Sequence, residues 1–266
     1  MPELPEVESV RRQLAPRLEG RTILAVHAEP QRRFVAVEDA AGRRVAALHR
    51  RGKFLLASLD GGLELVLHLG MTGMLRFREG DWEPDAYVRA TLTLDDAVLD
   101  FRDVRRFGRL AVVAAGDYAA IPTLAQLGPE PLSSAFTAEG LHAALARTRM
   151  PIKPFLLSQR PVAGVGNIYA DEALWRARIN PRARRVGRER ATRLHAAIRE
   201  VLADAVEREG TTFRDYQMVN GASGRNADFL VAYGQQGRAC PRCGRALTRV
   251  VLAGRGTTYC TRCQQR

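Results

Sequence analysis

The chain has 266 residues, of which 46% are hydrophobic and 26% are charged, values typical of a globular protein that exclude a disordered chain. Lys and Arg (41) outnumber Asp and Glu (29), so the net charge is +12, which favours nucleic acid as a partner first and an anionic membrane surface second. No apolar run approaches the ~20 residues of a spanning helix, and the acidic start does not resemble a secretory signal. We therefore expect a cytoplasmic protein.

The first half of the chain predicts one helix followed by many short strands. Val7, Val10 and Leu14 recur at helical spacing and predict a helix over residues 5–18, with Pro16 expected to distort or end its last turn. Short alternating, β-branched runs follow, and so many of them at this spacing predict a β-sandwich or barrel. These runs cover residues 22–26, 34–37, 44–48, 54–59, 63–67, 87–94, 98–101 and 109–113.

The second half changes to a helical period after a linker over residues 116–131. Thr137 is expected to cap a helix through residue 147, and further helices are predicted over 167–177 and 188–207. Residues 220–226 are predicted to form a flexible loop. This pattern divides the chain into a domain over residues 1–115, a second over 132–222 and a tail over 236–266.

All but two of the 41 basic residues are arginines, because Lys53 and Lys153 are the only lysines. A bias in base composition would favour arginine everywhere and explains the imbalance without any function. Lysine nevertheless offers a compact charge that loses its proton when desolvated, which arginine does not. The two lysines are therefore candidates for positions where a guanidinium cannot serve.

Four cysteines lie in the last 27 residues as two Cys-x2-Cys pairs separated by 16 residues. They are Cys240, Cys243, Cys260 and Cys263. This spacing is typical of a tetrahedral zinc site in which all four ligands come from the protein, which leaves no position for a substrate. Two disulfides are the alternative, but disulfides are rare in a reducing compartment. We expect one structural Zn²⁺, whose removal should unfold the tail and weaken binding to nucleic acid.

The chain starts Met-Pro-Glu-Leu-Pro-Glu, which offers an unusual nucleophile. If Met1 is removed, Pro2 becomes a free secondary amine with a pKa near ~8, so that part of it is neutral at physiological pH. Such an amine can attack a sugar aldehyde carbon to give an iminium ion, which promotes elimination. Glu3 and Glu6 would stand close by for proton transfer. Many unrelated proteins also start Met-Pro, so the pair alone does not establish this chemistry.

Two glycine-containing segments, residues 68–73 and 103–108, lie at predicted strand ends. Met71, Arg105 and Phe107 on such loop tips could enter a duplex and fill the space left by an extruded base. The alternative is that Met71 and Phe107 belong to the core and the arginines to a solvated face.

Three further residues could hold phosphate groups. Asn167 and Tyr169 stand at the predicted start of a helix, whose positive end attracts anions, although Asn167 could equally be a simple helix cap. Arg255 lies between two glycines in the cysteine-rich tail, where a phosphate contact and an ordinary charged turn look alike.

Taken together, the motifs resemble the bacterial formamidopyrimidine-DNA glycosylase family, which shares a superfamily with the endonuclease VIII type. The resemblance runs from end to end of the chain. Leu4, Met71 and Arg105 favour the formamidopyrimidine branch. The motifs are residues 1–8, 51–54, 68–73, 103–108, 127–132, 164–169 and the four-cysteine module.

The resemblance implies a role for each matching residue. Pro2 corresponds to the nucleophile that attacks C1′ of the damaged nucleotide, Glu3 to the acid/base residue and Lys53 to the lysine that assists base release and elimination. Met71, Arg105 and Phe107 correspond to the void-filling residues. DNA contacts are implied for His68, Lys153, Asn167, Tyr169 and Arg255, and support of the active site for Glu6 and Glu172.

The family fold implied is an α+β multidomain protein. It comprises an N-terminal β-sandwich with flanking helices, a helix-two-turn-helix domain and a C-terminal β-hairpin zinc finger. The implied activity is excision of oxidised purines (8-oxoguanine and formamidopyrimidines) from double-stranded DNA, then β,δ-elimination at the abasic site. A monomer associated with the bacterial nucleoid is expected, with no redox cofactor or catalytic metal.

One segment departs from the family pattern. Residues 219–235 lack the Gly-x-Pro-Gly-Tyr-Phe motif that is common in the family's lesion-capping loop. The family's contacts to the lesion therefore cannot be assigned to residues of this segment. Two rival functions stay open at this point. One is an endonuclease VIII-like glycosylase for oxidised pyrimidines, and the other is a non-catalytic zinc-containing DNA-binding protein.

Overall fold

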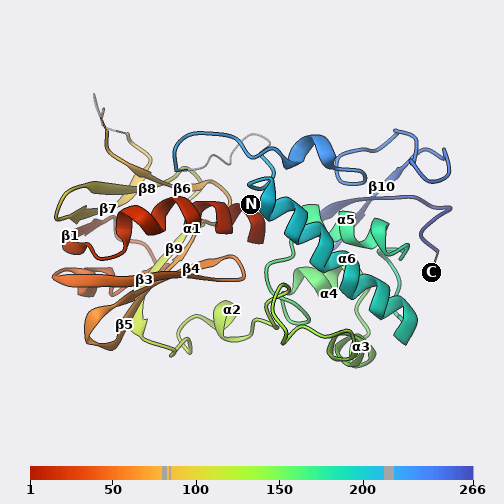
Figure 1. Ribbon diagram of the computed structural model, residues 1–266, viewed down its shortest axis with the longest axis horizontal. Coiled ribbons are helices and arrows are strands. Elements are labelled where there is room, and N and C mark those ends of the chain that lie inside the picture. Colours follow the sequence, from red (N-terminus) through yellow and green to blue (C-terminus); the bar gives the residue numbers. More distant parts are fainter. Residues whose placement is uncertain (80–82, 84, 213–218, 266) are drawn as a thin grey trace. The chain divides into compact units, whose positions relative to one another are not determined.

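The computed structural model describes residues 1–79, 83, 85–212 and 219–265, which divide into two compact units (Figure 1). The first unit comprises residues 1–125 and 208–225, and the second comprises residues 126–207 and 226–266. The domain boundaries at residues 115, 131, 222 and 236 stay a prediction, and residues 213–218 and 266 lie outside the described part. Within that part, no helix is long and apolar enough to cross a membrane.

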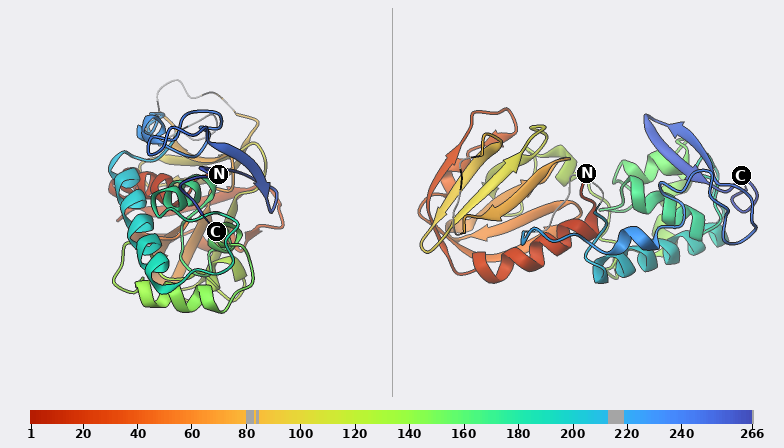
Figure 2. Two further views of the ribbon diagram at one scale, coloured as in Figure 1. Left: turned by 90° about the vertical axis from the view of Figure 1, so that its right-hand side faces the viewer. Right: turned by 90° about the horizontal axis from the view of Figure 1, so that it is seen from above.

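The first unit contains a helix, nine strands and the short α2 (Pro122–Ala125). The helix α1 (Leu4–Leu18) lies along β3 and β4 (Figure 2). Each of the eight predicted runs overlaps a strand, and β6 (Gly73–Phe77) was missed because Met74 interrupts its short alternation. The strands are β1 (Thr22–Ala28), β2 (Phe34–Val35), β3 (Arg43–Arg51), β4 (Phe54–Leu59), β5 (Leu63–His68), β6 (Gly73–Phe77), β7 (Val88–Leu94), β8 (Val98–Asp103) and β9 (Arg109–Ala114).

These strands form one hydrogen-bonded order, β2-β9-β5-β4-β3-β1-β7-β8-β6, which folds over on itself at the β3–β1 junction. Only two residue pairs join β1 to β3, whereas six join β4 to β5. Phe34 of β2 and Phe101 of β8 lie 6.1 Å apart between ring centroids, although their strands are far apart in the order. The two halves therefore face each other, which confirms the predicted β-sandwich.

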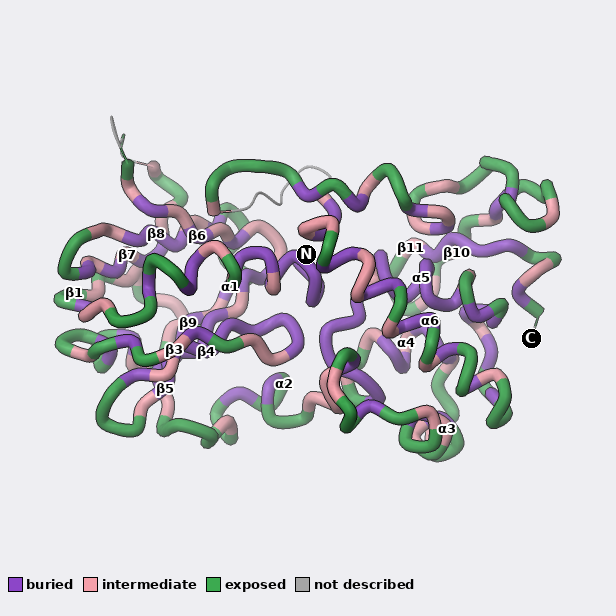
Figure 3. The backbone as a smooth tube through the Cα atoms, viewed as in Figure 1, coloured by how far each residue is buried: buried purple, intermediate pink, exposed green. Residues whose placement is uncertain are grey.

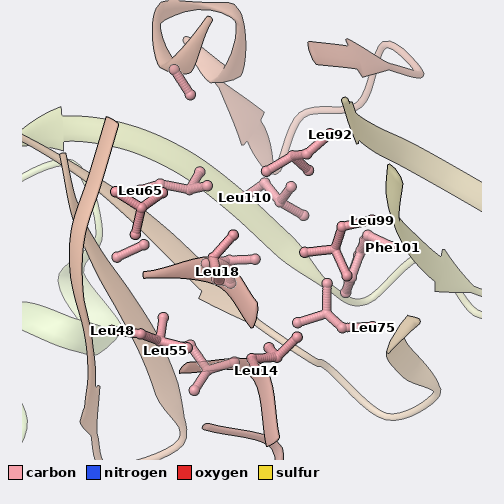
Figure 4. Close-up of a cluster of buried hydrophobic side chains, with 14 of the residues drawn as sticks. Leu14, Leu18, Leu48, Leu55, Leu65, Leu75, Leu92, Leu99, Phe101 and Leu110 are labelled. Atoms are coloured by element: carbon pink, nitrogen blue, oxygen red, sulfur yellow. The ribbon is translucent and has the colours of Figure 1, made fainter. Parts of the chain in front are cut away.

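Leucine side chains from both halves fill the space between them (Figure 4). Leu55 and Leu110 come from one half and Leu92 and Leu99 from the other, and all four are at most 1% exposed. Burial alternates along β6, whereas β4 and β5 each have four consecutive buried residues. Buried stretches and exposed turns are coloured in Figure 3.

Helix α1 covers this core with the predicted face, since Val7, Val10, Leu14 and Leu18 are at most 3% exposed. The helix continues to Leu18 as predicted, so Pro16, which was expected to distort or end the last turn, does not end it. Proline lacks the N–H that would bond to the carbonyl four residues earlier and its ring crowds that carbonyl, but the last turn tolerates one lost bond.

The second unit is built on helices and a two-stranded hairpin. The amphipathic α6 matches its prediction at both ends, and it packs against α3 and α5. Thr137 caps α3 as predicted, by accepting the N–H of Gly140 at 3.0 Å. The short helix α4, which contains Pro154 in its first turn, was not predicted. The elements are α3 (Ala138–Ala146), α4 (Ile152–Leu157), α5 (Asn167–Arg176), α6 (Arg188–Glu207), β10 (Thr248–Leu252) and β11 (Arg255–Tyr259).

Candidate functional site

The start of the chain is buried and held by one carboxylate. Pro2 is buried, and Glu3, which is 2% exposed, forms the N-cap of α1. Glu6 accepts the N–H of Glu3 on Oε2 and the N–H of Thr211 on Oε1, each at 2.7 Å. Charge-assisted bonds of this kind are stronger than neutral ones. Glu6 therefore fixes the backbone that carries Pro2 against residue 211.

Gly210 makes this close approach possible. Its φ of +82° lies in the left-handed region, and a Cβ there would lie 2.7 Å from Glu6 Oε1. Any other residue would be strained and would push the Glu6 carboxylate away from Thr211. The sequence motifs did not identify this glycine, because it lies more than 200 residues from Glu6.

Lys53 lies at the β3–β4 turn and is 7% exposed. Arg50 fixes this turn by donating from Nη1 to the carbonyl of Gly52 at 3.1 Å, while its Nε lies 3.1 Å from Glu8 of α1. Burial alone would raise the pKa of the Glu8 carboxyl, but Arg11 and Arg50 lower it below the ordinary value. The Glu8–Arg50 pair thus ties the first turns of α1 to the turn that carries Lys53.

His68 ends β5 directly opposite Phe54, the neighbour of Lys53, and the two rings lie 4.7 Å apart. Burial, together with the charges of Lys53 and Arg109, lowers the pKa of His68 to about 4. The imidazole is therefore neutral near pH 7. Because Nδ1 accepts the N–H of Gly70 at 3.0 Å, Nε2 carries the hydrogen and can donate to a phosphate oxygen.

The two predicted loop tips meet at Asp103, which is 1% exposed. Its Oδ1 accepts the Thr72 hydroxyl at 2.6 Å, and its Oδ2 accepts the N–H of Gly108 at 2.7 Å. A Cβ on Gly70 would lie 2.5 Å from the carbonyl carbon of Phe107, so the loops are in backbone contact. Asp103 therefore sets the relative position of the Met71 loop and the Arg105–Phe107 loop.

The side chains at these tips are not part of the core. Phe107 is 41% exposed, Arg105 is exposed and Met71 is half-buried, so the alternative that Met71 and Phe107 belong to the core was wrong. The Arg105 guanidinium lies 4.9 Å from the centre of the Phe107 ring. Arg33 donates to the Phe107 carbonyl at 2.8 Å, and this bond fixes the backbone of the loop. An exposed Phe and Arg on a braced loop can stack on and hydrogen-bond to bases.

In the second unit, Asn167 is the first residue of α5. Gly166 occupies the N-cap position, so the alternative that Asn167 merely caps the helix was wrong. The Asn167 Oδ1 is buried with no hydrogen-bond partner among the described residues. The other end of this amide, the Nδ2 group, is a donor, and at the positive end of a helix it suits a phosphate oxygen. Tyr169, in contrast, is 1% exposed, and its ring lies in the interior.

Lys153 is fully buried in an ion pair. Its Nζ lies 2.7 Å from Asp171 Oδ1 and donates to the Gly256 carbonyl and the Thr257 hydroxyl at 3.0 Å each. Asp171 also accepts the N–H of Thr258 at 2.9 Å. Burial raises the pKa of Asp171 to about 6, although Lys153 beside it acts in the opposite direction. The pair therefore joins α4 and α5 to strand β11.

Glu172, one residue further along α5, holds the end of the 219–235 segment. Its carboxylate accepts the N–H of Ala232 and the N–H of Tyr233 at 2.8 Å each, and that of Val231 at 3.1 Å. Burial raises the pKa of Glu172, and the three N–H donors partly offset this effect. The predicted buried carboxylate is thus present, and in this unit it anchors a loop.

The four cysteine Sγ atoms all lie within 4.8 Å of one another, with Cys243 and Cys260 at 3.5 Å and Cys240 and Cys263 at 4.0 Å. A tetrahedral site with Zn–S bonds of about 2.3 Å has S–S distances of about 3.8 Å, so the residues fit one zinc ion. Four thiolates would leave the ion no open position, and its role is to hold the chain together. Arg255 is exposed at the start of β11, after a turn in which Ala253 and Gly254 adopt positive φ.

Comparisons with known proteins agree along the whole chain. Residues 1–110 match the family described as "Formamidopyrimidine-DNA glycosylase N-terminal domain", and residues 127–217 match its H2TH domain. Residues 237–266 match the "Zinc finger found in FPG and IleRS". The formamidopyrimidine-DNA glycosylase of Thermus thermophilus is 51% identical over 99% of this chain and 98% of the relative. That of Deinococcus radiodurans is 46% identical over 99% and 97%.

The chain belongs to the formamidopyrimidine-DNA glycosylase family. The match to its zinc-finger model, with the sulfur geometry, shows that the four cysteines form a structural zinc site.

The crystal structure of the Thermus thermophilus MutM (Fpg) protein is similar, with a TM-score of 0.92 at 50% identity over 99% of this chain and 98% of that one. A wild-type Lactococcus lactis Fpg in complex with DNA containing N7-benzyl-Fapy-dG has a TM-score of 0.91 at 33% identity, with both chains fully covered. A MutM complex with DNA containing carbocyclic 8-oxo-G has a TM-score of 0.90 at 34% identity, also with both chains fully covered.

Proposed function

We propose that this protein is a bifunctional DNA glycosylase and AP lyase that excises oxidised purines from double-stranded DNA. The observation that carries the proposal is the buried Pro2-Glu3 pair at the head of α1, in a chain 51% identical to a formamidopyrimidine-DNA glycosylase. The relatives bound to Fapy-dG and 8-oxo-G DNA support oxidised purines as the substrate class. DNA with abasic sites is the substrate of the lyase step.

Pro2 acts as the nucleophile once Met1 has been removed by hydrolysis. Its secondary amine forms a bond to C1′ while the bond from C1′ to the damaged base breaks, and the departing base takes a proton. The sugar ring opens to an iminium ion, and two eliminations break the C3′–O and C5′–O bonds. A gap with phosphate at both ends remains, and hydrolysis of the iminium releases Pro2.

Glu3 and Lys53 serve the proton transfers, and Glu6 positions the chain that carries Pro2. Neutral His68 donates from Nε2 to a backbone phosphate, and Asn167 and Arg255 hold further phosphates. Met71, Arg105 and Phe107 fill the space left by the extruded nucleotide. Lys153 and Glu172 act from within their unit by positioning β11 and residues 231–233. The buried ring of Tyr169 supports the start of α5.

The protein works in this proposal as a monomer in the bacterial cytoplasm, on the DNA of the nucleoid. Residues 1–115 form its catalytic β-sandwich domain, and 116–131 form a linker. Residues 132–222 form the DNA-binding helix-two-turn-helix domain, and 236–266 form the zinc finger.

Borohydride trapping tests the mechanism. Protein with confirmed loss of Met1 is mixed with a duplex containing 8-oxoguanine opposite cytosine, beside Pro2→Gly and Glu3→Gln variants. We expect a covalent adduct with the wild-type protein and none with Pro2→Gly. Glu3→Gln should trap on an abasic duplex but not on the oxidised base, because the abasic site bypasses base release.

Two outcomes would replace the proposal. Faster cleavage of thymine glycol or 5,6-dihydrouracil than of 8-oxoguanine would assign the endonuclease VIII type of activity. Tight, salt-sensitive DNA binding that yields no adduct on any of these duplexes would assign a non-catalytic DNA-binding protein.

A further inference from the structure

The second unit contains a cavity of about 530 Å³ whose charged lining among the described residues is arginine, apart from the zinc ligand Cys263. It lies between the end of α5, the first turns of α6 and the two cysteine pairs of the zinc site. The arginines that line it are Arg178, Arg190, Arg193, Arg242 and Arg262. So many guanidinium groups around one cavity create a strongly positive potential.

Backbone carbonyls orient two of these arginines without neutralising them. Arg242 donates to the carbonyls of Trp175 and Arg176 at 2.6 Å and 3.1 Å and stacks 3.8 Å from the centre of the Trp175 ring. Arg190 donates to the carbonyl of Gln265 at 2.8 Å. Arg193 pairs with Glu189, whose side chain is 88% exposed. The pocket therefore keeps most of its positive charge.

Arg178 and Arg262 are exposed, and their side chains form no hydrogen bond or ion pair with any other described residue. Arg178 also has a φ of 58°, directly after the C-cap Ala177 of α5. Glycine is favoured at this left-handed position, and other residues are strained there. Arg178 therefore places a guanidinium at the pocket although its backbone conformation is strained.

The arginines repel one another. Burial and the charge of Arg193 lower the pKa of Arg190. A bound anion would relieve this repulsion, and the planar guanidinium matches the oxygens of a phosphate in a two-pronged geometry.

We propose that this arginine pocket binds backbone phosphates of DNA away from the damaged nucleotide. It lies at the C-terminal end of α5, whereas Asn167 lies at the other end of the same ten-residue helix, about 15 Å away. It is therefore a separate site from the one at Asn167. This inference rests on the proposed function, because DNA is the polyanion that the protein meets.

The test measures the salt dependence of binding to a duplex of about 30 base pairs, with and without 8-oxoguanine. The variants are Arg178→Gly, Arg262→Gln and their combination. Arg178→Gly removes the charge and relieves the strained φ, so its melting temperature should not fall. Arg147→Gln is the matched control, because Arg147 is equally exposed in the same unit, has no charged partner among the described residues and lies outside the pocket.

We expect the slope of log K against log salt concentration to decrease by about 1 to 2 for the double variant and to stay unchanged for the control. Excision at saturating protein should also stay unchanged, because the pocket touches no reacting atom. Unchanged slopes would overturn the inference. The affinity of the same variants for pyrophosphate is measured beside the slopes: if this affinity falls while the slopes stay unchanged, the pocket binds a free phosphate compound and not DNA. A wild-type protein that excises no lesion would instead refute the proposed function, and the salt slopes would still report on the pocket.

Discussion

The two lysines of the chain lie in contrasting surroundings. Lys53 occupies a turn in the first unit, 7% exposed, beside a histidine whose pKa it helps to lower. Lys153 is 0% exposed in the second unit and forms an ion pair with Asp171 at 2.7 Å. The first is predicted to meet the ligand, whereas the second holds helices and a strand together.

The comparison teaches that the same signal in a sequence has two physical origins. Lysine at position 153 fits because a compact ammonium group reaches one carboxylate, one carbonyl and one hydroxyl within 3.0 Å. A guanidinium is larger and planar and could not replace it without moving β11. At position 53, lysine places a compact charge close enough to His68 to help lower the pKa of that residue. Four predictions test this contrast.

Removing the zinc should have the largest effect on stability, and this effect should be confined to the unit that contains Lys153. Structural zinc sites contribute binding free energies of about 10–16 kcal/mol, which are lost with the metal. Gly256 and Thr257, which accept hydrogen bonds from Lys153, belong to the β10–β11 hairpin. If the hairpin unfolds when the zinc is removed, the buried ion pair of Lys153 should loosen as well. Hydrogen exchange at Thr258 measures this, and restoring zinc is the control. Full protection of Thr258 in zinc-free protein would contradict the prediction.

Asp171→Asn should cost about 3–5 kcal/mol in unfolding free energy, because it leaves Lys153 buried without a counter-ion. The matched control is Asp204→Asn, since Asp204 lies 3.7 Å from Arg176 in an exposed pair that is worth at most about 1 kcal/mol. Denaturant unfolding measures both. Equal losses in the two variants would show that the buried pair is not what joins β11 to α5.

The Lys53 region should lose stability as the pH falls. The pKa of His68 is about 4 in the folded protein against an ordinary value of 6.5, so between these pH values the unfolded chain binds a proton that the folded chain does not. Stability is therefore fully present above pH 6.5 and decreases towards pH 4, by about 3 kcal/mol for this residue. The free energy of unfolding is measured for the wild-type protein and for His68→Gln at pH 7 and at pH 4.5. The difference between the two proteins isolates the contribution of His68, because the carboxylates titrate in both. Parallel pH profiles for the two proteins would refute it.

Lys53→Gln should lower the single-turnover excision rate by about 100-fold while the melting temperature changes little. Its counterpart Lys153→Met should do the opposite and lower stability more than the rate of bound enzyme. Lys53→Arg should not restore the rate if a compact charge is what the site requires. A melting temperature for Lys53→Gln as low as that of Asp171→Asn would remove the distinction between the two lysines.

The sequence predicted those features whose physical cause is local. Residues 188–207 were assigned as a helix from their apolar period, and the eight strand runs from their alternation. The zinc ligands followed from the spacing of four cysteines, because two tight turns present their thiolates without help from the rest of the fold. Pro2 and Glu3 were candidates from the chemistry of the chain start and Lys53 from the scarcity of lysine. The family resemblance then implied their roles, and those roles stay predictions.

Other features depended on contacts between residues far apart in the chain, and no local pattern predicts such contacts. Gly210 beside Glu6, Asp103 between two loop tips and the Glu8–Arg50 pair exist only because the chain returns to the same place. The arginine pocket is assembled from residues 178–193 and 242–265, two segments that are 49 residues apart in the chain. The buried partner Asp171 likewise came from the tertiary structure, since a charge removed from water needs a partner that no local pattern supplies. The sequence by itself determined which chemical groups the protein carries, and the tertiary structure decided which of them meet.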